Sequence, residues 1–190
     1  MTNGEAYPFF RHSSRFEDWR TTMWYVMQVR TGREEETISM VHRYTTDSHM
    51  GVLFLPKYEQ KKKFAGAWHL VQALLFPGYV FVETEEIEKF YMGLKQVPKL
   101  TKLLGTGEKW TSIIDEDLKV LEKLLDKEKT VGMSTGYMEG DKVMVVDGPL
   151  EGLETVIRRI DRHKRMATVE MHMFGRVQEV AVGLEIVGRM

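Results

Sequence analysis

The periodicity of apolar residues changes once along this chain, and that change restricts the folds it can adopt. Between residues 23 and 126, segments with apolar side chains at alternating positions are interleaved with segments of helical spacing. From residue 137 to 190, only short strand-like segments remain, separated by turns that contain glycine. Helix and strand mixed in one half, with strand alone in the other, predict an α+β fold of two domains.

Three strands and three helices are expected in the first domain. Alternation is clearest in WYVMQVR, residues 24–30, where odd-numbered side chains point one way and even-numbered side chains the other. Thr31 and Glu34 have the spacing of a capping box, and Asp115 is a plausible N-cap for the last helix. We expect strands at 24–30, 52–60 and 78–84, and helices at 31–44, 86–94 and 111–125.

Composition divides the chain into four segments. Residues 1–22 scatter charges and lack the apolar segment of a secretory signal, so we expect a flexible leader. In residues 127–136, glycine, serine, threonine and charged residues replace the apolar periodicity, which predicts a linker. The first domain then spans 23–126. The second, 137–190, is expected to be a small β-barrel, because closure removes exposed strand edges.

Composition also excludes several classes of function. The 190 residues include no cysteine, which excludes disulfides and thiolate metal sites and favours a reducing, cytoplasmic location. The most apolar run, residues 70–82, is too short to cross a bilayer, so we expect no membrane partner. The six histidines lack metal-ligand spacing, and no phosphate loop or nucleophile elbow is present. We therefore expect no metal, no cofactor and no enzymatic activity.

Two motifs together resemble one known family. WYVMQVRTG, followed some 45 residues later by LFPGYVFVE, is similar to the N-terminal domain of the NusG family of transcription factors. EGDKVMVVDGPLEGLETVIRRID resembles a KOW motif, the signature of the SH3-like barrel that ends those proteins. The resemblance implies an N-terminal NusG-type (NGN) α/β sandwich domain and a C-terminal KOW barrel. The basic barrel and the long loop before FPGYVFV resemble the specialised LoaP-type antiterminators.

The resemblance implies a mechanism that depends on binding alone, in which no covalent bond is made or broken. The first domain would bind the clamp helices of the β′ subunit of RNA polymerase and bridge toward the β subunit, which favours the active conformation. We expect the protein to act as a monomer. Alternatively, the aromatic residues of these motifs are simply core. The residues that the resemblance places in or beside the polymerase pocket are Trp24, Tyr25, Phe76, Pro77 and Tyr79.

Positive charge is concentrated in RRIDRHKR, residues 158–165, although the formal net charge of the chain is −1. Arginine forks suit phosphate groups and guanine edges, so we interpret this octet as a site for a nascent RNA hairpin. A solvated turn is the alternative. Arg176 is expected to lie nearby. The candidate RNA-binding residues are Arg158, Arg159, Arg162, His163, Lys164, Arg165 and Arg176.

A second basic run, KKK at 61–63, lies in a segment expected to be a hairpin tip or a loop. It is interpreted as a contact with DNA or the β subunit at the edge of the polymerase cleft, or as a solvated hairpin. Trp68 and His69 in the same segment receive no role.

The sequence therefore predicts a NusG-type processive antiterminator that binds polymerase through one domain and RNA through the other. Two alternatives stay open. One is a general elongation factor whose barrel binds proteins, and the other is a ribosome-associated KOW protein. In the family, the loop GPLEGLETV contacts the termination factor Rho or a ribosomal protein. Leu153 and Thr155 depart from the usual pattern there, which puts those partnerships in doubt.

Overall fold

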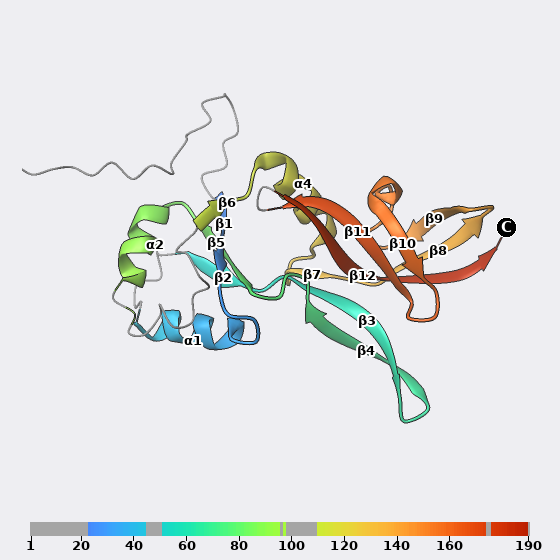
Figure 1. The fold of residues 1–190 in the computed structure, drawn as a ribbon, viewed down its shortest axis with the longest axis horizontal. Helices are drawn as coiled ribbons and strands as arrows, with labels where there is room; N and C mark the ends of the chain where they lie inside the picture. Colours follow the sequence, from blue (N-terminus) through green and yellow to red (C-terminus); the bar gives the residue numbers. More distant parts are fainter. Residues whose placement is uncertain (1–22, 45–50, 96, 98–109, 174–175, 190) are drawn as a thin grey trace, which may run out of the picture.

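The computed structural model has the predicted mixed α+β architecture, built on three sheets (Figure 1). It describes residues 23–44, 51–95, 97, 110–173 and 176–189, so the expected leader, 1–22, lies outside the described residues. Figure 1 shows α1 and α2 at one end of the molecule and the strands of the C-terminal barrel at the other. Within the described residues, no helix is long and apolar enough to cross a membrane.

The first sheet has four strands in the order β2-β5-β1-β6, and the neighbouring strands are antiparallel. Its strands are β1 (Met23–Gln28), β2 (Val52–Phe54), β5 (Tyr79–Thr84) and β6 (Trp110–Ser112). Strands β1 and β5 alternate as predicted. Met27 and Val80 enter one apolar cluster, whereas Trp24 and Phe81 enter another. The two faces of this sheet therefore carry different side chains.

The three described helices divide between these faces. They are α1 (Glu34–Tyr44), α2 (Ile87–Leu94) and α4 (Asp115–Leu124). Val41 of α1 and Phe90 of α2 pack with Val80 and Val82 on the aliphatic face of the sheet. Leu118 and Leu121 of α4 belong instead to the cluster that contains Trp24. Helix α4 begins at Asp115 itself and the N-cap residue is Ile114, so the predicted capping role of Asp115 is wrong.

A long hairpin leaves the first sheet at Pro56. It consists of β3 (Lys57–Phe64) and β4 (Ala67–Leu74) and projects away from the body of the molecule in Figure 1. Ala65 and Gly66 form its two-residue turn with φ of 49° and 78°, the backbone signature of a type I′ hairpin. Residues 61–70 are thus the distal part of a hairpin, and the predicted strand at 52–60 is split into β2 and the start of β3.

The C-terminal barrel is a five-stranded sheet in the order β10-β11-β12-β8-β9. Its elements are β8 (Ser134–Glu139), β9 (Lys142–Asp147), the 3-10 helix η1 (Glu154–Val156), β10 (Ile157–Asp161), β11 (Met166–Met173) and β12 (Arg176–Arg189). Alternate residues of β11, such as Val169 and Met171, are buried, as the period of two in a half-buried strand requires.

The segment expected to be a linker, residues 127–136, carries regular structure. Strand β7 (Thr130–Val131) pairs in parallel with β3, and β8 begins at Ser134. Thr130 and Val131 are buried, so this segment gains sheet hydrogen bonds and apolar contacts that its composition did not indicate. The division into domains at 126 and 137 stays a prediction.

Glu34 fixes the turn that enters β5. Its buried carboxylate accepts a 2.7 Å hydrogen bond from the backbone N–H of Gly78. Gly78 has a left-handed backbone conformation, with φ of 86°, and a Cβ there would lie only 2.9 Å from Thr31 Oγ1. Both the backbone conformation and the lack of room for a side chain therefore require glycine. Burial raises the pKa of Glu34, but backbone hydrogen bonds from Glu34, Gly78 and Gly32 outweigh it and lower the pKa below 4.5.

Glu34→Gln is expected to reduce the free energy of unfolding at pH 7 by about 1–3 kcal/mol, since it removes a charge-assisted hydrogen bond from a buried site. Because the folded pKa of Glu34 is lowered, its stabilisation is present above pH 4.5 and is lost as pH falls through the folded value. Urea unfolding of the parent and the variant should therefore converge at acidic pH. Glu35→Gln, at the exposed neighbouring position, is the control; equal effects at both positions would contradict this role.

Candidate functional site

One face of the first sheet is aromatic. The rings of Trp24 and Phe54 lie 4.9 Å apart at an interplanar angle of 71°, and Phe81 lies 5.5 Å from Phe54 and 5.4 Å from Phe76. These edge-on and tilted arrangements are favourable for aromatic pairs. The cluster is an apolar platform made by β1, β2 and the chain entering β5.

This aromatic face is packed in the present conformation. Trp24 and Phe76 are 5% exposed, and they belong to one continuous apolar cluster with Leu121 of α4 and Met173 of β11. The Lys129 ammonium lies 4.1 Å from the Trp24 ring centroid and 3.0 Å from a carboxylate oxygen of Glu83. A cation over an indole face is attracted by the ring quadrupole. Helix α4, the barrel and the segment before β7 thus contribute to the same core as the platform.

The five residues expected at a polymerase pocket do not share one surface. Trp24 and Phe76 are buried in the aromatic cluster, and Tyr79 packs at its edge. Tyr25 lies on the other face of the sheet with the aliphatic cluster, where burial raises the pKa of its hydroxyl. Pro77 is exposed in the turn before β5.

The basic octet forms β10, the turn after it and the residue that precedes β11. A bulge between Ile157 and Arg159 places Arg158 outside the regular register. Its guanidinium is bidentate on Glu170, with Nε–Oε2 and Nη2–Oε1 distances of 3.1 and 2.9 Å. The hydrogen bond raises the pKa of Arg158 and lowers the pKa of Glu170. Glu170 therefore neutralises one of the five basic side chains.

Arg165 is also neutralised. It has φ of 56°, a left-handed conformation that is uncommon outside glycine, and its Nη1 lies 2.8 Å from Glu185 Oε1. Its guanidinium lies 4.1 Å from the centroid of Trp68 on the hairpin. Glu185 also pairs with Lys61 of the hairpin. Arg165 therefore joins the barrel to β3–β4, a role that the sequence did not indicate.

The other basic residues of the octet face solvent. Arg159, Arg162, His163 and Lys164 are exposed, and Arg159 and Arg162 form no ion pair within the described part of the chain. Asp161 holds the turn by accepting a 2.9 Å hydrogen bond from the Lys164 N–H, which lowers the pKa of Asp161. The Lys164 ammonium lies 3.9 Å from the same carboxylate.

Arg176 does not join this group, and the expectation that it lies nearby is wrong. The register of β11 with β12 pairs Met166 with Gly183 and Met173 with Arg176, so Arg176 lies at the opposite end of β11 from the basic turn. A strand of that length separates its ends by roughly 23 Å. Arg176 Nη2 instead donates a 2.9 Å hydrogen bond to the hydroxyl of Tyr79.

Comparison with known proteins identifies the family. The model of the family described as "Transcription termination factor nusG" matches residues 22–122, more than half of the chain. The chain belongs to the NusG family. The match covers the first sheet, the hairpin and α4 as far as residue 122.

Full-length NusG proteins are similar over most of the chain. The transcription termination/antitermination protein NusG of Haemophilus influenzae is 29% identical over 166 residues, which cover 83% of this chain and 88% of that protein. The protein of the same name from Pseudomonas aeruginosa is 26% identical over 159 residues, covering 80% and 90%. A solved structure titled "Domain interaction in Thermotoga maritima NusG" is 25% identical, covers 87% of this chain and 94% of that one, and has a TM-score of 0.49.

Three residues that take part in the contacts of this site were not identified from the sequence. Phe54 completes the aromatic face, and strand alternation in VLFLP would have placed it there. Trp68 and Lys129 act through contacts between distant segments, and no local pattern signals those. No group of three or more histidine, aspartate or glutamate side chains suited to a metal occurs among the described residues.

Glu185→Gln is expected to weaken the contact between hairpin and barrel by about 1–2 kcal/mol, because each partner of its two ion pairs is less than a third exposed. Amide hydrogen exchange should become faster in β3 and in the part of β12 beside it. Glu179→Gln, an exposed carboxylate on the same strand, should leave exchange unchanged. Unaltered exchange in Glu185→Gln would show that other contacts hold the hairpin.

Proposed function

We propose that this NusG-family protein is a processive transcription antiterminator. Its N-terminal half would bind RNA polymerase at the β′ clamp helices, and its C-terminal barrel would bind a hairpin in the nascent RNA. The relatives described above are named as NusG itself, so the LoaP-type specialisation is part of the proposal. Because one chain would bind both the nascent RNA and RNA polymerase, it would raise the local concentration of the RNA hairpin beside the enzyme.

The basic turn is the observation that carries RNA binding. Eight Lys/Arg and nine Asp/Glu occur in residues 136–190, yet five of the eight lie in one octet. Of those five, Arg159 and Arg162 are exposed and have no carboxylate partner in the described residues, and Lys164 is exposed beside Asp161. Exposed guanidinium groups retain all their donors for phosphate. The proposed contacts are therefore Arg159, Arg162, His163 and Lys164, with Arg158 and Arg165 serving the fold.

The aromatic face supports polymerase binding. A partner helix can place apolar side chains on such a platform. In the present conformation the platform packs with α4 and the barrel, so a polymerase helix could bind there only after α4 or the barrel moved away from the platform. Pro77, beside the platform, is the exposed member of the predicted set.

A second candidate function rests on one observation. Arg158 and Arg165 are held by Glu170 and Glu185, which reduces the charge that the octet offers to RNA. A general elongation factor whose barrel binds proteins would tolerate this neutralisation. That candidate predicts no measurable affinity of the full chain for hairpin RNA.

Replacing Arg159 and Arg162 together by glutamate is expected to reduce the slope of log K against log salt by about 1.4–1.8, as the loss of two phosphate contacts requires. The measurement is fluorescence anisotropy of the full chain with labelled hairpins from the 5′ leaders of neighbouring operons. Neither arginine has an ion pair in the described residues, so the double substitution leaves no carboxylate without its partner.

Lys142→Glu together with Lys119→Glu is the matched control, because both are exposed cations, on β9 and α4, and the net charge changes by the same amount. It should leave the slope unchanged. Absence of RNA affinity in the parent, or equal slopes in all three proteins, would favour the general elongation factor.

Pro77→Glu is expected to weaken binding to RNA polymerase elongation complexes by about tenfold or more, since a charge placed beside an apolar contact must be desolvated on docking. Co-sedimentation or biolayer interferometry with assembled complexes measures it. Met92→Glu on α2 is the control, because Met92 is also an exposed apolar residue, at 59%, and lies on the helical side of the sheet. Equal binding by both variants would remove the turn before β5 from the polymerase interface.

A further inference from the structure

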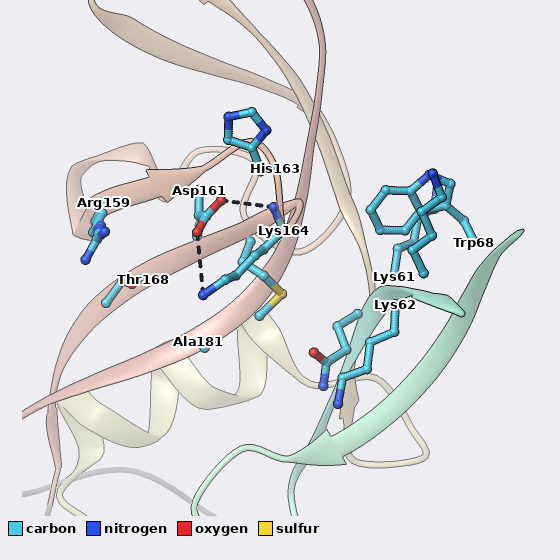
Figure 2. Close-up of a pocket in the computed structure, with 13 residues that line it drawn as sticks. Lys61, Lys62, Trp68, Arg159, Asp161, His163, Lys164, Thr168 and Ala181 are labelled. Carbon is cyan, nitrogen blue, oxygen red and sulfur yellow. Dashed lines mark hydrogen bonds and ion pairs between the residues drawn. The ribbon is translucent and has the colours of Figure 1, made fainter. Parts of the chain in front are cut away.

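A groove lies between the β3–β4 hairpin and the barrel. Its cavity volume is about 540 Å³. Figure 2 shows Lys61, Lys62 and Trp68 approaching it from the hairpin, while Arg159 and Lys164 approach from the barrel. Met166, Ala167, Thr168 and Ala181 of β11 and β12 also line it. The groove therefore combines the two basic runs of the sequence, which lie about 100 residues apart.

The lining is strongly basic. The lining contains five lysine or arginine side chains and one histidine, but only one carboxylate, that of Asp161. Lys61 is paired with Glu185, which leaves Lys62, Lys63, Arg159 and Lys164 as exposed cations. Cations gathered around one concave surface repel one another and focus a positive potential there. An anionic ligand relieves that repulsion.

Three contacts hold the two walls of the groove in place. Gly183 of β12 passes so close to β3 that a Cβ there would lie 2.5 Å from the carbonyl oxygen of Glu59 and would clash with Met133. Glu185 joins Lys61 to Arg165, and Arg165 stacks on Trp68. The groove is thus built by the contact between hairpin and barrel, since neither wall alone carries both sets of cations.

We infer that the hairpin and the barrel together form one composite RNA-binding groove, with Lys62 and Lys63 contacting phosphates on one side and Arg159 and Lys164 on the other. This inference rests on the proposed RNA binding by the barrel and extends the site to the N-terminal half. Trp68 lines the groove and is 40% exposed beside the Arg165 guanidinium, so part of its ring is open to an unpaired loop base. Aromatic and basic side chains interleaved in this way suit a nucleic acid better than an acidic protein surface.

The test uses the full chain and a labelled RNA stem-loop of ten base pairs with a six-nucleotide loop. The hairpin variant carries Lys62→Glu and Lys63→Glu, and the barrel variant carries Arg159→Glu and Lys164→Glu. Each should lower the slope of log K against log salt by about 1.4–1.8. Between 50 and 200 mM salt, each variant should then lose about seven- to twelve-fold less affinity than the parent. Lys119→Glu together with Lys142→Glu, at exposed cations on α4 and β9 outside the groove, is the control, because it changes the net charge by the same amount.

The outcomes separate this inference from the proposed function. A lowered slope in both variants, with an unchanged slope in the control, supports the composite groove. A lowered slope in the barrel variant alone overturns the composite groove and leaves RNA binding by the barrel intact. No change in either variant, or no binding by the parent, overturns both. Equal binding and equal slope changes with a DNA stem-loop of the same sequence would overturn the assignment to RNA.

A second measurement guards against an indirect effect of the hairpin lysines. The stem-loop carries 4-thiouridine in its loop, and ultraviolet crosslinking is followed by peptide mapping. Crosslinks to both 57–74 and 157–173 support the composite groove. Crosslinks confined to 157–173, with far-ultraviolet circular dichroism showing all variants folded, overturn it.

Discussion

The close approach of β12 to β3 at Gly183 determines how the two halves of this protein are arranged. Only a residue without a side chain lets the two backbones come this near, because a Cβ would meet the carbonyl of Glu59. With the strands at that distance, Glu185 can reach Lys61, and Arg165 can reach Trp68. The groove between hairpin and barrel depends on this contact between distant segments.

Carboxylates decide which cations are available for a ligand. Glu170 and Glu185 each hold one arginine of the octet in a defined geometry, and Asp161 orders the turn between them. The remaining cations point into solvent or into the groove. The basic octet therefore contains two kinds of side chain. Arg158 and Arg165 stabilise the barrel and its contact with the hairpin, whereas exposed cations such as Arg159 and Arg162 can bind phosphate.

The sequence predicted what depends on local periodicity. Alternation in 24–30 separated Trp24 from Met27, and alternation in 78–84 separated Phe81 from Val80; the structure confirms both separations and shows that Trp24 and Phe81 share a face. It missed what depends on register and on contacts between distant segments. The bulge that turns Arg158 toward Glu170 has no local signal. Arg176 lies far from the basic turn because β11 runs for eight residues between them, a length that the local pattern does not specify. The strand β7 pairs with an edge of β3, more than 70 residues away in the sequence, and no local pattern signals that pairing.

The pairing of β7 with β3 shortens the segment that connects the barrel to the N-terminal half. Val131 is the last residue of β7 and Ser134 is the first of β8, so only Gly132 and Met133 lie between them. A fully extended chain spans at most about 3.6 Å per residue, which limits the separation of those two ends to about 11 Å. While β7 remains paired with β3, the first strand of the barrel stays tethered within that distance of the hairpin, so the barrel cannot separate from the N-terminal half as an independent module.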